Sequence, residues 1–375
     1  MEATVYLDNS ATTRPIPEVI RCVCERMEQS FYNPSAVYTA GLDAENDLNT
    51  ARQTIADKLG CHAEELYFTS GATEANNLAV FGAAQALMRR GKHIVTTALE
   101  HPSVYEPMRQ LEEMGFEITW LTGKTAGVSE QQILEALRPD TVLVSVMKVN
   151  NELGTVSPID QIGSQIKQKA KHALVHCDAA QAAGKVPVDI KQLDLLTLSG
   201  HKLHAPKGIG VLYIKKGVRL RPLFYGGGQE KGLRPGTEPT ALIAGLAAAF
   251  AHMAPFDTLA KTLKQQLIDG LKNLQGAVVN SPVNAAPHIV NFSLPGYQSE
   301  TLIHFLDKRG IFVSGGAACY KGKRSRVLIQ AGLPDEQIAS ALRVSFCKDN
   351  TRQDVKRLLD ALQEAQTVLA RSTHS

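Results

Sequence analysis

Cysteine is scarce in this chain and follows no repeating pattern. Only six of the 375 residues are cysteine, and Cys22 and Cys24 lie two residues apart, which is not the C-x-x-C spacing of zinc and redox sites. Scattered cysteines in a chain of this size are typical of reduced thiols in a cytoplasmic protein. We therefore expect no disulfide framework and no metal site, and chemistry at very few of these thiols.

Charge of one sign and long apolar runs are also missing. The 40 basic and 37 acidic residues leave a net charge of +3, which is too balanced to indicate direct binding to nucleic acid or to a membrane surface. No uninterrupted apolar run approaches the ~18 residues of a membrane-spanning helix. The first residues, MEATVYLDNS, lack the basic and apolar segments of a signal peptide. The composition thus predicts a cytoplasmic globular protein.

What the sequence does contain is a long alternation of short apolar runs and segments of helical spacing. The runs that we interpret as strands cover residues 66–69, 93–97, 116–121, 141–149, 173–177, 195–198 and 209–214. Helical segments, such as 102–114 and 158–171, lie between them. This order predicts a large α/β domain with a mainly parallel sheet and helices on both faces.

After residue 256 the order of the elements changes. The strands expected there are 288–292, 311–313 and 342–346. Mixed with helices, they predict a smaller α+β domain. A chain of this length can bury the cores of two such units. We place the large domain at residues 14–255, and the small domain at residues 256–375 together with residues 1–13.

The stretch LLTLSGHKLHAPKGIGVLYI, residues 195–214, places a lysine where a buried strand ends. Two apolar runs bounded by glycine and proline indicate strands, and Lys202 lies in the turn between them. In open α/β sheets functional groups gather at strand ends, and a lysine that loses its charge by desolvation can form a Schiff base with an aldehyde. Taken alone, Lys202 is more simply explained as a surface lysine whose stem packs on apolar neighbours.

Lys202 is not the only polar residue in such a position. His101, Asn151 and Asp178 also come directly after apolar runs, so all four are expected at the carboxyl edge of the sheet, where such folds bind ligands. Each has a structural explanation by itself: Asp178 as a helix N-cap, and His101, which precedes a proline, as a turn histidine. Four such residues at one edge favour a functional site.

The segment FTSGATEANNLA, residues 68–79, has the pattern of an anion site. A strand, a turn of small residues and a helix start bring free backbone N–H groups and the positive end of the helix dipole together. The segment lacks the Gly-Lys-Ser/Thr ending of a Walker motif and the glycine pattern of a dinucleotide site. Phosphate binding near Thr73 is indicated, although a plain helix cap at Thr73 is an equally simple interpretation.

Nine short motifs follow one another along nearly the whole chain. They are YLDNSATT (6–13), FTSGATEANNLA (68–79), EHPSV (100–104), VNNELG (149–154), HCDAAQAAGKVPVD (176–189), SGHKLHAPKGIG (199–210), RPGTE (234–238), SGGAAC (314–319) and RVSF (343–346). In this order they are specific. The chain resembles the cysteine desulfurases of the NifS/IscS type, within the class V aminotransferase group of pyridoxal-phosphate enzymes.

The resemblance implies fold type I of the pyridoxal-phosphate-dependent transferases, with pyridoxal 5'-phosphate held by several of these motifs. Lys202 would hold the cofactor as a Schiff base, Asp178 would pair with its pyridine nitrogen, and His101 would stack on its ring and shuttle protons. Arg343, together with Asn151, would bind the substrate, because a guanidinium suits a carboxylate. The other implied cofactor contacts are Asn151 and Gln181 at the ring oxygen, and Ala72, Thr73, Ser199, His201 and, from the second subunit of a homodimer, Thr237 at the phosphate.

The same resemblance assigns the distinctive chemistry of the family to Cys319. Its thiolate would attack the sulfur of L-cysteine, leaving L-alanine and a persulfide on Cys319 for delivery to a sulfur-acceptor protein. The acceptor stays open between iron–sulfur cluster assembly and tRNA thiolation, because SGGAAC differs from the commoner SGSAC and the segment after Cys319 is shorter than in the housekeeping type. Without the resemblance, an inert buried thiol is the simpler interpretation of Cys319.

Three other functions stay open. A selenocysteine lyase differs only in the chalcogen of its substrate. A class V aminotransferase would use the same lysine but would not need Cys319. A non-catalytic scaffold with this fold is the third alternative, and the set formed by Lys202, Asp178, His101 and Cys319 argues against it, because a binding module has no use for these residues.

Overall fold

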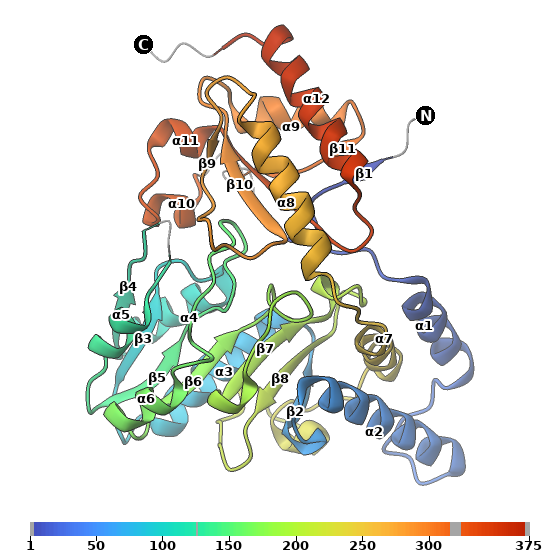
Figure 1. The fold of residues 1–375 in the computed structure, drawn as a ribbon. Coiled ribbons are helices and arrows are strands. Elements are labelled where there is room, and N and C mark those ends of the chain that lie inside the picture. Colours follow the sequence, from blue (N-terminus) through green and yellow to red (C-terminus); the bar gives the residue numbers. More distant parts are fainter. Residues whose placement is uncertain (1–3, 125–126, 316–323, 372–375) are drawn as a thin grey trace.

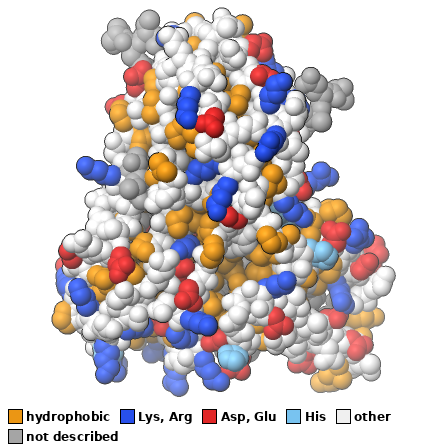
Figure 2. All heavy atoms as spheres, in the orientation of Figure 1, with side chains coloured by type: hydrophobic (Ala, Val, Ile, Leu, Met, Phe, Trp, Pro, Cys, Tyr) orange, Lys and Arg blue, Asp and Glu red, His pale blue; other side chains and the backbone are white. Residues whose placement is uncertain are grey.

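The computed structural model describes residues 4–124, 127–315 and 324–371. Figure 1 shows two lobes, the lower built on a seven-stranded sheet and the upper on a four-stranded sheet. Basic and acidic side chains are interspersed over the face shown in Figure 2. Within the described ranges, no helix is both long and apolar enough to cross a membrane.

The seven-stranded sheet has the order β2-β8-β7-β6-β5-β3-β4. Its strands are β2 (Leu66–Thr69), β3 (His93–Thr97), β4 (Glu117–Leu121), β5 (Thr141–Ser145), β6 (Leu174–Asp178), β7 (Leu195–Ser199) and β8 (Gly210–Ile214). Neighbours from β7 to β4 pair in parallel, as the alternation predicts, whereas β8 runs antiparallel to both β7 and β2. The connection 200–209 is too short for a crossover helix, so the chain turns back on itself there.

Helices cover both faces of this sheet, which explains why its strands appear in the sequence as continuous apolar runs. Successive strand residues point to opposite faces, so Leu195 joins one helical layer and Leu196 the other. One layer contains α1 (Pro17–Gln29), α2 (Thr39–Leu59), α5 (Glu130–Glu135), α6 (Gly163–Lys169) and α7 (Thr240–Ala251). The other layer contains α3 (Ala72–Leu87) and α4 (Pro102–Glu113).

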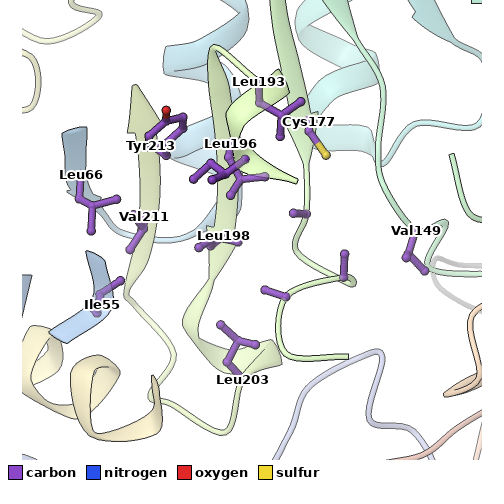
Figure 3. Close-up of a cluster of buried hydrophobic side chains, with 14 of the residues drawn as sticks. Ile55, Leu66, Val149, Cys177, Leu193, Leu196, Leu198, Leu203, Val211 and Tyr213 are labelled. Atoms are coloured by element: carbon purple, nitrogen blue, oxygen red, sulfur yellow. The ribbon is translucent and has the colours of Figure 1, made fainter. Parts of the chain in front are cut away.

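Buried hydrophobic side chains of β7 and β8 pack together in one cluster and hold these strands in place (Figure 3). Leu196 and Leu198 of β7 lie opposite Tyr213 and Val211 of β8 in the antiparallel register. All four side chains are buried in one hydrophobic cluster. Because this packing holds β7 rigidly, the turn that follows it, at residues 200–202, is held in place as well.

The upper lobe contains an antiparallel sheet of order β12-β13-β10-β9. Its strands are β9 (Val278–Val279), β10 (Ile289–Ser293), β12 (Ser314–Gly315) and β13 (Ala341–Ser345). Its helices are α8 (Asp257–Leu271), α9 (Ser299–Asp307), α10 (Arg326–Gln330), α11 (Asp335–Ala339) and α12 (Arg352–Val368). The mainly parallel α/β architecture with a smaller α+β part agrees with the predicted fold class.

The N-terminal end of the chain packs in the upper lobe. Strand β1 (Val5–Tyr6) pairs in parallel with β11 (Ile311–Phe312), and Val5 and Leu7 belong to the hydrophobic cluster of that lobe. Residues 5–7 therefore lie beside the C-terminal part of the chain. The domain boundaries at residues 14–255 and 256–375 stay a prediction.

One predicted helix is much shorter than expected. The sequence favours a helix over 158–171, but α6 covers only Gly163–Lys169. Before it, Asp160 forms a buried ion pair with Lys148, with 2.5 Å between Oδ1 and Nζ, and its other oxygen accepts from the backbone N–H of Asp189. Because these contacts hold Asp160 against neighbouring segments, the chain begins its helical turns later than the apolar spacing indicates.

His176 on β6 gives the fold an acid-sensitive site. Its ring is buried and pairs with Ser145 Oγ at 2.8 Å and Thr197 Oγ1 at 3.1 Å, and burial lowers its pKa to about 4. An unfolded histidine titrates near pH ~6.5, so acidification favours the unfolded state as the pH falls from there towards the folded-state pKa. We expect this residue alone to cost about 2 kcal/mol of stability between pH 7 and pH 5.

Urea unfolding of the wild type and of His176→Gln, each at both pH values, measures this contribution. The variant should lose about 2 kcal/mol less than the wild type on acidification. Equal losses in the two proteins would mean that His176 does not contribute to the acid sensitivity.

Candidate active site

A cleft of ≈ 490 Å³ lies at the carboxyl edge of the seven-stranded sheet. Its walls come from the ends of β6 and β7, from the start of α3, from residues 10–11 and from β12 and β13 of the upper lobe. Ten residues singled out in the sequence line it together: Ala72, Thr73, His101, Asn151, Asp178, Gln181, Ser199, His201, Lys202 and Arg343. The structure brings these side chains to one place, and their individual roles stay predictions.

Lys202 ends the short 3-10 turn Gly200–Lys202 that follows β7. Its Nζ donates to the carbonyl oxygens of Ser10 at 2.5 Å and Ala11 at 2.7 Å. Both acceptors belong to the segment that follows β1, so the N-terminal part of the chain reaches over the lysine. The amine therefore lies in the cleft, held by neutral carbonyl groups.

Asp178, the last residue of β6, is a buried carboxylate in the cleft, which Glu74 also lines. Its Oδ2 accepts from Asn76 Nδ2 at 2.8 Å, and its Oδ1 accepts from the backbone N–H of Ala180 at 2.9 Å. Asn76 Nδ2 also donates to Ser103 Oγ at 2.8 Å, and this hydroxyl lies 2.8 Å from His101 Nδ1. A buried chain of hydrogen bonds thus connects the carboxylate to the histidine.

His101 is held in one orientation and one tautomer. Its Nδ1 accepts from the backbone N–H of Ser103 at 3.1 Å, so the proton of the neutral ring lies on Nε2. The residue presents surface to the cleft, but the protein around its ring lowers the imidazole pKa by desolvation. The Asp178 carboxylate opposes this shift, and the positive charges of Lys202 and Arg326 add to it. His101 is therefore neutral near pH 7.

The start of α3 forms the small-residue turn that the sequence predicts. Gly71 adopts φ 152°, ψ −179° before the first helical residue, Ala72. A Cβ on the neighbouring Gly210 would lie only 2.6 Å from the Cα of Gly71, so glycine at that position lets β8 pass directly behind the turn. The first residues of α3, including Thr73, line the cleft, and the N–H groups of a first helical turn have no partner within their helix.

Positive charge surrounds this end of the cleft. Lys202 and Lys207 both line it. Desolvation, together with the charges of Lys202, Lys207 and Lys185, lowers the pKa of His201 to about 4. The neutral ring of His201 pairs with Thr12 Oγ1 at 3.2 Å. A helix start with lysines around it provides a potential that suits a phosphate group.

Residues 5–358 match the family described as aminotransferase class V. The chain belongs to this family. Its cofactor is accordingly pyridoxal 5'-phosphate. Cysteine desulfurase IscS of Methanosarcina thermophila is 40% identical over 370 residues, which cover 96% of this chain and 91% of that protein. A protein from a Nostoc strain, described as a cysteine desulfurase, is 38% identical over 374 residues, covering 96% of this chain and 92% of its own.

Solved structures agree with this assignment. One described as a NifS-like protein superposes with a TM-score of 0.92 at 34% identity, covering 98% of this chain and all of that chain. Another, described as SspA in complex with cysteine, superposes with a TM-score of 0.82 at 37% identity, covering 92% and 99% of the two chains. The class V assignment therefore covers residues 5–358, and the structural similarity extends over at least 92% of the chain.

Several buried polar atoms in the cleft of this class V protein have no hydrogen-bond partner among the described residues. Ser10 Oγ, Asn151 Oδ1, Gln181 Oε1 and Arg343 Nε are buried and have no hydrogen-bond partner among the described residues. All four residues line the cleft. Since buried polar groups are normally paired, these atoms fit a bound polar molecule. Together with the buried carboxylate and the positively charged helix start, they fit a cofactor with a ring nitrogen, a ring oxygen and a phosphate.

Gln181 shows one difference from its predicted contact. The predicted partner of its side chain is the ring oxygen of the cofactor. In this structure its Nε2 donates to the carbonyl oxygen of Ser10 at 2.9 Å, while Oε1 has no hydrogen-bond partner in the part of the chain that the structure describes. An amide nitrogen carries two N–H groups, so the second N–H of Nε2 is the one that would donate to the ring oxygen.

Two of the predicted site residues, Thr237 and Cys319, have no described place in this cleft. Thr237 is exposed in the segment before α7 and is not among the lining residues. Cys319 lies outside the described residues. On either side of the undescribed segment, Ser314 lines the cleft, and Ser325 donates to Glu152 Oε2 at 2.5 Å.

The hydrogen-bonded chain that joins Asp178 to His101 was not predicted as part of the site. Asn76 lies in the motif FTSGATEANNLA and Ser103 in the motif EHPSV, but neither was singled out. A fully buried asparagine in the middle of a helix was the available signal, because such a side chain needs polar partners. We expect Asn76→Ala to raise the dissociation constant of pyridoxal 5'-phosphate by about tenfold or more, because the Asp178 carboxylate loses a donor.

Titration of the cofactor-free proteins with pyridoxal phosphate measures this effect. Asn77→Ala is the matched control: its side-chain amide donates to Thr73 O on a less buried face of the same helix, and its constant should stay within about threefold of the wild type. An Asn76→Ala protein that binds the cofactor as tightly as the control would contradict this account.

Proposed function

We propose that this protein is a cysteine desulfurase that converts L-cysteine to L-alanine and transfers the sulfur to Cys319 as a persulfide. The observation that supports this most strongly is the convergence of Lys202, Asp178, His101 and Arg343 in one cleft. Relatives described as cysteine desulfurases match the chain at about 40% identity. A related structure is described as a complex with cysteine.

In this proposal the residues of the chain have separate tasks. When bound, pyridoxal phosphate supplies a carbonyl carbon for amine attachment and a ring that withdraws electrons from the substrate. Lys202 would hold that carbon, and the Asp178 carboxylate would pair with the protonated ring nitrogen. Arg343 binds the substrate carboxylate, and His101, neutral with its proton on Nε2, exchanges protons with the substrate.

Cys319 completes the reaction. Its thiolate attacks the substrate sulfur, an S–S bond forms, and the bond between that sulfur and the substrate Cβ breaks. The electron pair of the broken bond stays with the carbon, which takes up a proton to become alanine. Four of the described thiols are poor substitutes, because burial raises the pKa of Cys22, Cys61, Cys177 and Cys347. For Cys347 the value reaches about 11.

The proposal includes a homodimer and a sulfur-acceptor protein. Thr237 is exposed on a segment tied to its own chain by an ion pair between Arg234 and Glu74, with 2.8 Å between Nε and Oε1. In a dimer this threonine would reach the phosphate of the second subunit. The acceptor belongs to iron–sulfur cluster assembly or to tRNA thiolation, and we infer a cytoplasmic location from the composition.

Comparison of three substrates tests the proposal against its rivals. The purified protein is given L-cysteine, L-selenocysteine, or L-alanine with a 2-oxo acid, and the amino-acid products are measured. A desulfurase forms alanine from L-cysteine at a rate at least comparable with that from selenocysteine. Strong preference for selenocysteine would favour the lyase, amino-group exchange with the 2-oxo acid would favour the aminotransferase, and no reaction would favour the scaffold.

A further inference from the structure

Arg343 on β13 uses two of its three nitrogens within the protein. Nη1 donates to the carbonyl oxygen of Asn151 at 2.9 Å, and Nη2 donates to Oδ1 of Asp8 at 2.7 Å. Nε is buried and has no hydrogen-bond partner among the described residues. A buried guanidinium N–H without an acceptor is costly, so the single N–H of Nε is suited to an oxygen of a bound ligand.

Asp8 and Arg343 belong to the same lobe. The chain after β1 runs beside the end of β13, where the backbone N–H of Ser345 donates to Leu7 O at 2.7 Å. The backbone bridge between Asp8 and Ser345 continues this pairing. Asp8 therefore holds the guanidinium from within the upper lobe, whereas Asn151 holds it from the lower lobe.

Asp8 lies behind Arg343 as seen from the cleft. Arg343 lines the cleft and Asp8 does not. The side chain of Arg343 is 7% exposed and that of Asp8 is 19% exposed, so the ion pair is largely shielded from water. The pair carries no net charge. Arg343 consequently selects an anion through the direction of its N–H groups more than through excess positive charge.

We propose that Asp8 is a positioning residue for substrate recognition, which holds the guanidinium of Arg343 with Nε directed at the carboxylate of the amino-acid substrate. This inference rests on the proposed role of Arg343 in the desulfurase. One N–H of Nη1 and one N–H of Nη2 are used within the protein, and Nε has no acceptor among the described residues, so we assign the substrate carboxylate to the Nε side. Among the described residues, loss of Asp8 leaves the guanidinium with the hydrogen bond from Nη1 to Asn151, about which the group can turn.

The test compares Asp8→Asn and Asp8→Ala with the wild type and with Asp43→Asn, an exposed Asp on α2 that serves as the control. We expect Asp8→Asn to raise the KM for L-cysteine about tenfold with kcat within about twofold, the pattern of lost substrate binding. Asp8→Ala should have the larger effect, since Asn still offers an oxygen to Nη2.

Calorimetry with two unreactive ligands separates positioning from a general structural effect. S-methyl-L-cysteine has the carboxylate, and its methyl ester lacks it. Asp8→Asn should raise the dissociation constant of the acid about tenfold and leave that of the ester unchanged. The proposal would be overturned if the dissociation constants of both ligands rose equally. It would also be overturned if the constant for the acid stayed unchanged or fell.

Arg343→Lys makes failure of the two proposals distinguishable. If Arg343→Lys raises the dissociation constant of S-methyl-L-cysteine but Asp8→Asn does not, Arg343 binds the carboxylate and only the proposed role of Asp8 is wrong. If Arg343→Lys leaves the dissociation constants of the acid and the ester unchanged, the proposed binding of the carboxylate by Arg343 is itself wrong. Cofactor absorbance and thermal unfolding of each variant show that the compared proteins are folded, and Asp8→Asn, which preserves shape, carries the comparison if Asp8→Ala does not fold.

Discussion

Lys202→Ala is expected to abolish covalent attachment of the cofactor and to lower the rate of alanine formation by at least about a thousandfold. The Lys202 amine lies in the cleft, where it donates to the carbonyl oxygens of Ser10 and Ala11. Alanine offers no nucleophilic nitrogen at this place. Borohydride reduction followed by peptide mass spectrometry should find the cofactor on the peptide with residue 202 in the wild type, and on no peptide in the variant.

Lys207→Ala is the control for this experiment, because Lys207 lines the same cleft. Its loss removes a positive charge near the helix start but should leave the cofactor attached to residue 202. Covalently bound cofactor in Lys202→Ala, on any residue, would remove Lys202 from the role that the sequence assigns to it.

Cys319→Ser is the second substitution with a large expected effect. The variant should still bind the cofactor and L-cysteine, which is visible as a change of cofactor absorbance on adding the substrate. Sulfide release with a reductant should fall by at least about a thousandfold, because a serine hydroxyl is not ionised near neutral pH and is a much weaker nucleophile than a thiolate.

An exposed cysteine on α1 provides the matched control. Cys24→Ser changes the same atom at a solvent-exposed position, so it should release sulfide at the wild-type rate. A normal sulfide yield from Cys319→Ser would show that the reaction does not pass through a persulfide on Cys319. That result would favour an aminotransferase or a lyase that does not need this thiol.

The sequence predicted the strands of the large sheet well, because they are buried on both faces. The limits of β2 and β3 agree with the predicted runs 66–69 and 93–97. Residues that follow such strands share one edge of the sheet. For that reason the apolar pattern alone was enough to predict that His101, Asp178 and Lys202, which are distant in the sequence, lie near one another.

Other parts of the site have weaker signals in the sequence. The contacts of Lys202 with Ser10 and Ala11 involve backbone oxygens, which every residue has, so no residue type marks them. The contact between Asp8 and Arg343 joins segments 335 residues apart, and its geometry depends on the pairing of the chain ends. The antiparallel direction of β8 follows from the length of a loop and not from the apolar pattern.

The most direct test of the central claim is mass spectrometry of the purified protein before and after addition of L-cysteine without reductant. The proposed function predicts that the peptide containing Cys319 gains one sulfur atom, and that one alanine forms for each sulfur gained. Cofactor attached at Lys202, with alanine formed but no sulfur on Cys319, would contradict it.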